Sequence, residues 1–113
     1  MYKIKRFSQT SNLLPKNLVS YDIDIEGDIN NIKDKNKKDK AISILKDPSQ
    51  YFGEIDKYEG TKISKLGGKY NIMGVEINDD YVSITVENSK TGMRFWELEI
   101  PLDKGDVEIS AGD

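Results

Sequence analysis

Three acidic residues in alternate positions, Asp22, Asp24 and Glu26, form the pattern in this chain that is most typical of a ligand site. Alternate residues of a β-strand share one face, and carboxylate oxygens are the ligands that Mg²⁺ and Ca²⁺ prefer. Neighbours in such a row lie roughly 6 to 7 Å apart, so one ion would also need ligands from an adjacent strand. A solvent-exposed acidic row that faces Lys3 and Lys5 explains the same pattern, and we favour it. A carboxylate-based magnesium or calcium site is therefore a minor hypothesis.

Other chemistry has few side chains to draw on, because the chain contains no histidine and no cysteine. Their absence excludes imidazole bases, thiolate nucleophiles, disulfides and most transition-metal sites. Catalysis would have to rest on carboxylates, lysines or tyrosines. The glutamates from Glu76 to Glu99 could supply a pair of carboxylates, but surface glutamates of an amphipathic sheet have the same spacing. We therefore expect a protein without catalytic activity and without a cofactor.

Lysines and aromatic rings follow one another in the middle of the chain, a mixture typical of proteins that hold single-stranded nucleic acid. The whole chain contains only two arginines, Arg6 and Arg94, whereas a reader of duplex DNA usually carries more. Single-strand binding is thus the first alternative to protein binding. Its candidate residues are Lys35, Lys37, Lys38, Tyr51, Phe52 and Tyr58.

Large side chains near residue 95 favour binding to another protein. Two sets alternate there, with Trp96, Leu98 and Ile100 on one strand face and Met93, Phe95, Glu97 and Glu99 on the other. If the first set is core, the second presents two large apolar groups to solvent, and such groups are enriched at interface centres. The alternative is that Met93 and Phe95 pack under the segment 36–60. The candidate interface residues are Met93, Phe95, Glu97 and Glu99.

The scaffold is clearest between residues 69 and 101, where three strands are separated by turn-forming residues at 78–80 and 89–92. Apolar and polar residues alternate along these strands, which predicts an antiparallel meander with one buried face. The predicted core residues are Val82, Ile84, Val86, Trp96, Leu98 and Ile100.

Shorter patterns complete the predicted fold. Residues 2–7 and 18–26 alternate as strands do, and we expect them to pair antiparallel. Residues from about 37 to 47 predict a helix with Asn36 as its N-cap, closed by Pro48. We expect a short helical turn and extended chain over 49–68, and a last strand over 106–110. The sequence therefore predicts one α+β domain, 1–113, with a mostly antiparallel sheet and one principal helix.

Charge is unevenly distributed, although the net charge is only −3. Residues 1–70 contain 14 Lys or Arg against 10 Asp or Glu, whereas residues 71–113 contain 3 against 10. A mixed, solubilising surface explains this asymmetry. The acidic half could also occupy a basic groove on a partner, which would accelerate association more than it would raise affinity.

The first eight residues, MYKIKRFS, resemble the starts of small uncharacterised proteins encoded by phages and mobile elements of low-GC bacteria. The resemblance implies a virion component or an inhibitor of a host protein, located in the cytoplasm of a bacterial host or in the virion. The sequence has no apolar run of about 18 residues and no apolar segment near its start. We therefore expect a soluble protein without a membrane span or signal peptide, whose partner is another protein.

Overall fold

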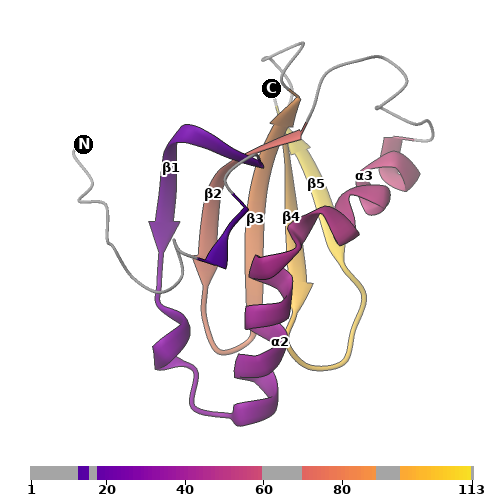
Figure 1. The fold of residues 1–113 in the computed structure, drawn as a ribbon. Coiled ribbons are helices and arrows are strands. Elements are labelled where there is room, and N and C mark those ends of the chain that lie inside the picture. The colour runs from indigo at the N-terminus through magenta and orange to yellow at the C-terminus, as the bar shows by residue number, and fades with distance from the viewer. Residues whose placement is uncertain (1–12, 16–17, 60–69, 89–94, 113) are drawn as a thin grey trace.

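The computed structural model describes residues 13–15, 18–59, 70–88 and 95–112, with residues 19–22 described as strand backbone only (Figure 1). The elements follow one another as β1 (Val19–Glu26), η2 (Ile29–Asn31), α2 (Lys35–Lys46), η3 (Pro48–Tyr51), α3 (Phe52–Glu59), β2 (Tyr70–Ile77), β3 (Tyr81–Asn88), β4 (Phe95–Pro101) and β5 (Glu108–Gly112).

The five strands form one sheet in the order β1-β2-β3-β4-β5. Strands β2 to β5 pair antiparallel, so the α+β class and the meander over 69–101 are confirmed, and β5 extends the meander by one strand. Strand β1 pairs parallel to β2, which makes the sheet mixed. This pairing follows from the connection between the two strands, because helices α2 and α3 return the chain to the starting end of the sheet. The predicted strand over 2–7 lies outside the described residues, as do residues 60–68 of the predicted extended segment.

Helix α2 begins slightly before its predicted start. Its N-cap is Asp34, whose Oδ2 accepts a hydrogen bond of 2.9 Å from the Lys37 backbone N–H. The predicted cap, Asn36, lies in the first turn instead, because Asp34 already satisfies one of the free N–H groups there. The helix ends at Lys46, and Pro48 begins η3.

The chain after Pro48 is more helical than predicted, since α3 continues to Glu59 and gives the fold a second helix. Gly53 lies inside α3, where glycine weakens a helix by about 1 kcal/mol. Ile55 of α3 is fully buried at 0% exposure. Packing of this apolar side chain against the rest of the fold therefore outweighs the low helix propensity of the segment.

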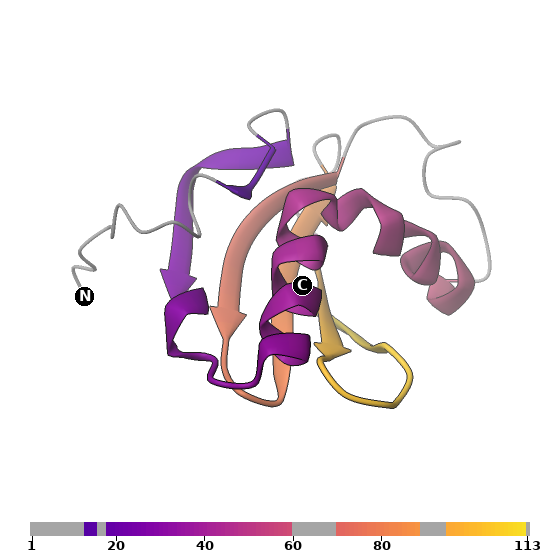
Figure 2. The same cartoon turned by 60° about the horizontal axis from the view of Figure 1, so that its bottom comes forward.

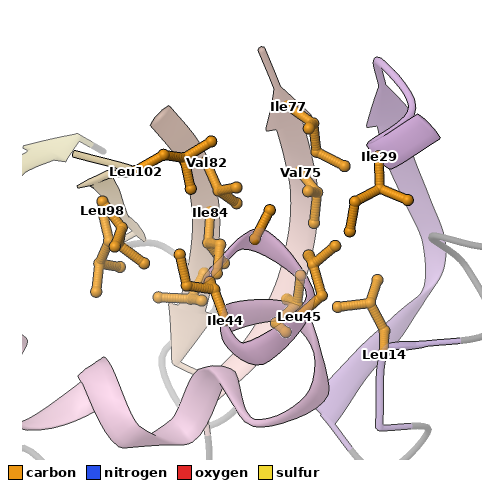
Figure 3. Close-up of a cluster of buried hydrophobic side chains, with 14 of the residues drawn as sticks. Leu14, Ile29, Ile44, Leu45, Val75, Ile77, Val82, Ile84, Leu98 and Leu102 are labelled. Carbon is orange, nitrogen blue, oxygen red and sulfur yellow. The ribbon is translucent and has the colours of Figure 1, made fainter. Parts of the chain in front are cut away.

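The core lies between the sheet and the helices, which cover the same face of the sheet (Figures 1 and 2). Ala41, Ile44 and Leu45 of α2 are fully buried, and Figure 3 shows Ile44 and Leu45 among side chains from the strands. All six predicted core residues are at most 1% exposed, so this prediction is confirmed. The other face of the sheet carries no described helix, and no described helix is long and apolar enough to cross a membrane.

Candidate functional site

We call the face of the sheet that points away from α2 and α3 the outer face. The strand registers arrange its paired residues in four rows that run across the strands. The Glu99 row contains Glu26, Glu76, Ser83, Glu99 and Glu108. The Glu97 row contains Asp24, Gly74, Thr85, Glu97 and Ser110. The Phe95 row contains Asn71, Glu87, Phe95 and Gly112, and a short fourth row contains Tyr81 and Pro101. Because adjacent strands lie about 4.8 Å apart, each row places its side chains close together.

Phe95 is the most exposed large hydrophobic side chain on the described part of the outer face. Its exposed fraction is 41%, and it begins β4 opposite Glu87 on one side and Gly112 on the other. A Cβ atom added to Gly112 would lie 2.8 Å from two atoms of the Phe95 ring. The ring therefore rests on the bare backbone of Gly112. The alternative prediction, that Phe95 packs under the segment 36–60, is wrong because that segment covers the opposite face.

Glu97 lies between two shallow hollows of the outer face. The Oγ of Ser83 donates a hydrogen bond of 2.8 Å to the Glu97 Oε2, which draws this carboxylate toward β3. The first hollow, about 170 Å³, has small residues at its centre and acidic residues around them; it is lined by Asp24, Glu26, Gly74, Val75, Glu76, Ser83, Thr85 and Glu97. Ser83 is only 3% exposed although it faces outward, so it forms part of the floor.

The second hollow lies over β4 and β5. It occupies about 130 Å³ and is lined by Glu97, Glu99, Glu108, Ile109 and Ser110. Glu99 and Glu108 are direct cross-strand partners, and like charges in this position repel one another. No described residue forms a salt bridge with either carboxylate, so the repulsion is not relieved within the described part of the chain.

The acidic row on β1 does not form a metal site with the residues described. Asp24 and Glu26 lie on the outer face, opposite Gly74 and Glu76, and both have further interactions within the chain. The side chain of Asp22 is not among those described. Across the described side chains, no group of three acidic residues is placed to hold a metal ion. The magnesium or calcium hypothesis thus gains no support from this geometry.

The nucleic-acid candidates are divided between two places. Lys35, Lys37 and Lys38 lie in the first turn of α2, whereas Tyr51, Phe52 and Tyr58 belong to η3 and α3 beyond its other end (Figure 1). An α-helix of twelve residues is about 18 Å long. Tyr58 is 50% exposed, but Phe52 packs against Tyr70 with ring centroids 4.9 Å apart. The fold therefore does not bring the lysines and rings into one surface.

Polar contacts beneath α3 have a structural role. The Trp96 Nε1–H donates to the Glu59 Oε2 at 2.7 Å, and the Tyr70 hydroxyl donates to the Asp56 Oδ1 at 3.1 Å. Burial raises the pKa of Tyr70, and the hydrogen bond to Asp56 and the nearby charges of Asp56 and Glu59 raise it further. Burial also raises the pKa of Tyr51. These contacts attach α3 to β2 and β4.

Of the four candidate interface residues, Phe95, Glu97 and Glu99 lie together on the outer face, whereas Met93 lies outside the described residues. The prediction did not include Ser83, Glu87, Glu108 or Gly112. Glu108 lies between the apolar residues Val107 and Ile109 in the predicted strand over 106–110, but only the register with β4 places it beside Glu99.

No family model, curated protein or solved structure matches this chain.

Proposed function

We propose that this protein acts by binding another protein through the outer face of its sheet, with Phe95, Glu97 and Glu99 at the centre of the contact. The observation that carries the proposal is the position of Phe95, which is 41% exposed on a sheet face that no described helix covers. Aromatic residues surrounded by polar groups are enriched where proteins bind one another. Phe95 has this setting, since Glu87 and Glu97 flank it.

The form of the outer face favours a macromolecular partner. Both hollows are shallow and open to solvent, whereas sites for small molecules are concave and enclose most of the ligand. A sheet face instead offers a broad surface whose residues are held in fixed register by the backbone hydrogen bonds. Such a surface binds without rearrangement, which keeps the entropy lost on association small.

The alternative of single-stranded nucleic acid has less support. Such binding needs a positively charged groove with rings along it. The five strands contain no Lys or Arg, and the candidate lysines Lys35, Lys37 and Lys38 lie in the first turn of α2, whereas the exposed ring of Tyr58 belongs to α3. The resemblance of residues 1–8 supports a more specific role for the protein binder, as an accessory protein of a phage or mobile element that is part of a virion or inhibits a host protein.

Affinity capture with matched variants tests the proposal. The wild-type protein, the Phe95→Ala variant and the Tyr58→Ala variant would each be immobilised and exposed to an extract of the cells that carry the gene. Tyr58 is the matched control, because it is exposed and aromatic but lies on α3. We expect the same bound protein with the wild type and Tyr58→Ala, and its loss with Phe95→Ala. Loss with Tyr58→Ala and retention with Phe95→Ala would contradict the proposal.

A further inference from the structure

We propose that the partner presents arginine side chains to the outer face, and that one guanidinium group occupies the hollow between Glu97, Glu99 and Glu108. This inference rests on the proposed function and names the chemistry of the partner. The occupant is a segment of another protein with arginine at its surface.

The first observation is the charge of the strands. The five strands contain eight Asp or Glu residues and no Lys or Arg. The eight are Asp22, Asp24, Glu26, Glu76, Glu87, Glu97, Glu99 and Glu108. The described side chains among them face outward, so the outer face is a negatively charged surface on which Phe95 is the most exposed large hydrophobic group among the described residues. A positively charged protein surface is its electrostatic complement.

The second observation is the pairing of Glu99 with Glu108. Their direct opposition across β4 and β5 destabilises the free protein, because like charges there repel. A cation between them would remove the repulsion and gain two charge-assisted hydrogen bonds. Binding of a positively charged group is therefore more favourable here than at an isolated surface glutamate.

The pairing of carboxylates in this hollow favours guanidinium over a metal ion or ammonium group. The described carboxylates do not converge closely enough to hold a metal ion. Glu99 and Glu108 lie directly opposite each other on neighbouring strands. A guanidinium carries its donors in a planar fork that can reach two carboxylates at once. An ammonium group is a compact, strongly hydrated point charge without this fork, so it matches the pair less well.

Phe95 belongs to the same surface, two residues before Glu97 on β4. A second arginine of the partner could stack on this exposed ring, since guanidinium groups lie favourably over aromatic faces. A second copy of this chain is a weaker occupant. Two outer faces would repel each other. Neither arginine of the chain is among the described residues, so the described cations that a second copy could present are all lysines.

Titration with a defined peptide tests the inference. The probe is a peptide of alternating arginine and threonine residues, and the same peptide with lysine in place of arginine is the comparison. NMR shifts of the ¹⁵N-labelled protein report where each peptide binds. We expect the largest changes at Glu97, Glu99, Glu108 and Ser110, with tighter binding of the arginine peptide and weaker binding as salt is raised. Changes confined to α2 or α3, or stronger binding of the lysine peptide, would overturn the inference.

Matched variants separate a local site from attraction by net charge. The double variant Glu99→Gln with Glu108→Gln removes two charges from the hollow, and Asp79→Asn with Asp80→Asn removes two from the β2–β3 turn. We expect the first to weaken arginine-peptide binding by about fivefold or more and the second by less than about twofold. Equal weakening would overturn the inference.

The same variants distinguish this inference from the proposed function. In affinity capture, loss of the bound protein with Phe95→Ala but full retention with the Glu99 and Glu108 double variant would refute the arginine site alone. Retention with all outer-face variants would refute the proposed function itself. Self-association of the wild type at low salt that the double variant abolishes would assign the face to a second copy and overturn the proposal of a foreign partner.

Discussion

Phe95 on β4 is the direct cross-strand partner of Gly112 on β5, and its ring occupies the space that a side chain at Gly112 would need. The glycine thus determines how the aromatic ring lies on the outer face. An aromatic residue opposite a glycine covers backbone that would otherwise be exposed, and cross-strand pairs of this kind contribute about 0.2 to 1 kcal/mol.

The first prediction is that the effect of Gly112→Ala on the free energy of unfolding depends on the residue at position 95. In the wild type it should lower the free energy of unfolding, because the new Cβ would lie 2.8 Å from the Phe95 ring. In the Phe95→Ala background it should be neutral or should stabilise by up to about 0.5 to 1 kcal/mol, because alanine loses less entropy than glycine on folding. Urea denaturation of the four proteins measures both effects. Equal effects in the two backgrounds would show that the ring does not rest on Gly112.

The second prediction concerns Gly27, which follows β1 with φ +89°. A Cβ at this position would collide with the carbonyl oxygen of Ile77, and a side chain there is strained in any case. Gly27→Ala should therefore destabilise the fold by at least about 1 to 3 kcal/mol. The control is Gly53→Ala in α3, where no described atom lies within 4 Å of the new Cβ apart from the neighbouring residues and the backbone of the helix itself. That variant should stabilise the fold by about 0.5 to 1 kcal/mol, and a loss of stability would contradict the helical conformation of Gly53 in α3.

The third prediction concerns the hydrogen bond between Trp96 and Glu59. Trp96 is 1% exposed, so removal of its acceptor leaves a buried indole N–H without that partner. Glu59→Ala should lower stability by about 1 to 3 kcal/mol, whereas Glu54→Ala, which removes only a surface contact with Lys57, should change it by less than about 0.5 kcal/mol. Trp96 is the only tryptophan, so its fluorescence follows unfolding in both variants. Similar losses of stability in Glu59→Ala and Glu54→Ala would indicate that the hydrogen bond between Trp96 and Glu59 does not stabilise the fold.

The fourth prediction is a loss of stability at alkaline pH. The pKa of Tyr70 is raised above its ordinary value of 10.0, so the folded state holds this proton more tightly than the unfolded state does. Stability is then fully present below pH 10 and falls as pH rises further, because the unfolded state releases the proton first. Tyr70→Phe should make the decline less steep. Melting temperatures of both proteins, measured from pH 9 to 11, would show this difference. If the melting temperature falls equally steeply with pH in the wild type and in Tyr70→Phe, the burial of this hydroxyl is contradicted.

The meander could be predicted from sequence because its signals are local. Val82, Ile84 and Val86 alternate strictly with polar residues, which indicates the side chains that face the core. Turn-forming residues separate the strands, which indicates that consecutive strands pair with each other. The parallel pairing of β1 with β2 could not be predicted in this way. It joins Val19 to Ile72, which are far apart in sequence, and depends on how α2 and α3 pack.

The candidate site was only partly predictable for the same reason. Alternation placed Phe95, Glu97 and Glu99 on one face, but whether a helix covered that face depended on the packing of α2 and α3. Glu108 joined the site through the register of β5, which is set by the loop after Pro101. Gly112 carries no side chain, so only the three-dimensional position of the Phe95 ring shows its importance.

Site-specific photo-cross-linking tests most directly whether the outer face is the binding surface. A photoreactive aromatic amino acid, p-benzoylphenylalanine, would replace Phe95 in one variant and Tyr58 in another, and each would be irradiated in an extract of the cells that carry the gene. We predict one dominant cross-linked protein from position 95, absent in the variant labelled at position 58. A cross-linked protein obtained from position 58 and not from position 95 would contradict the assignment of the outer face.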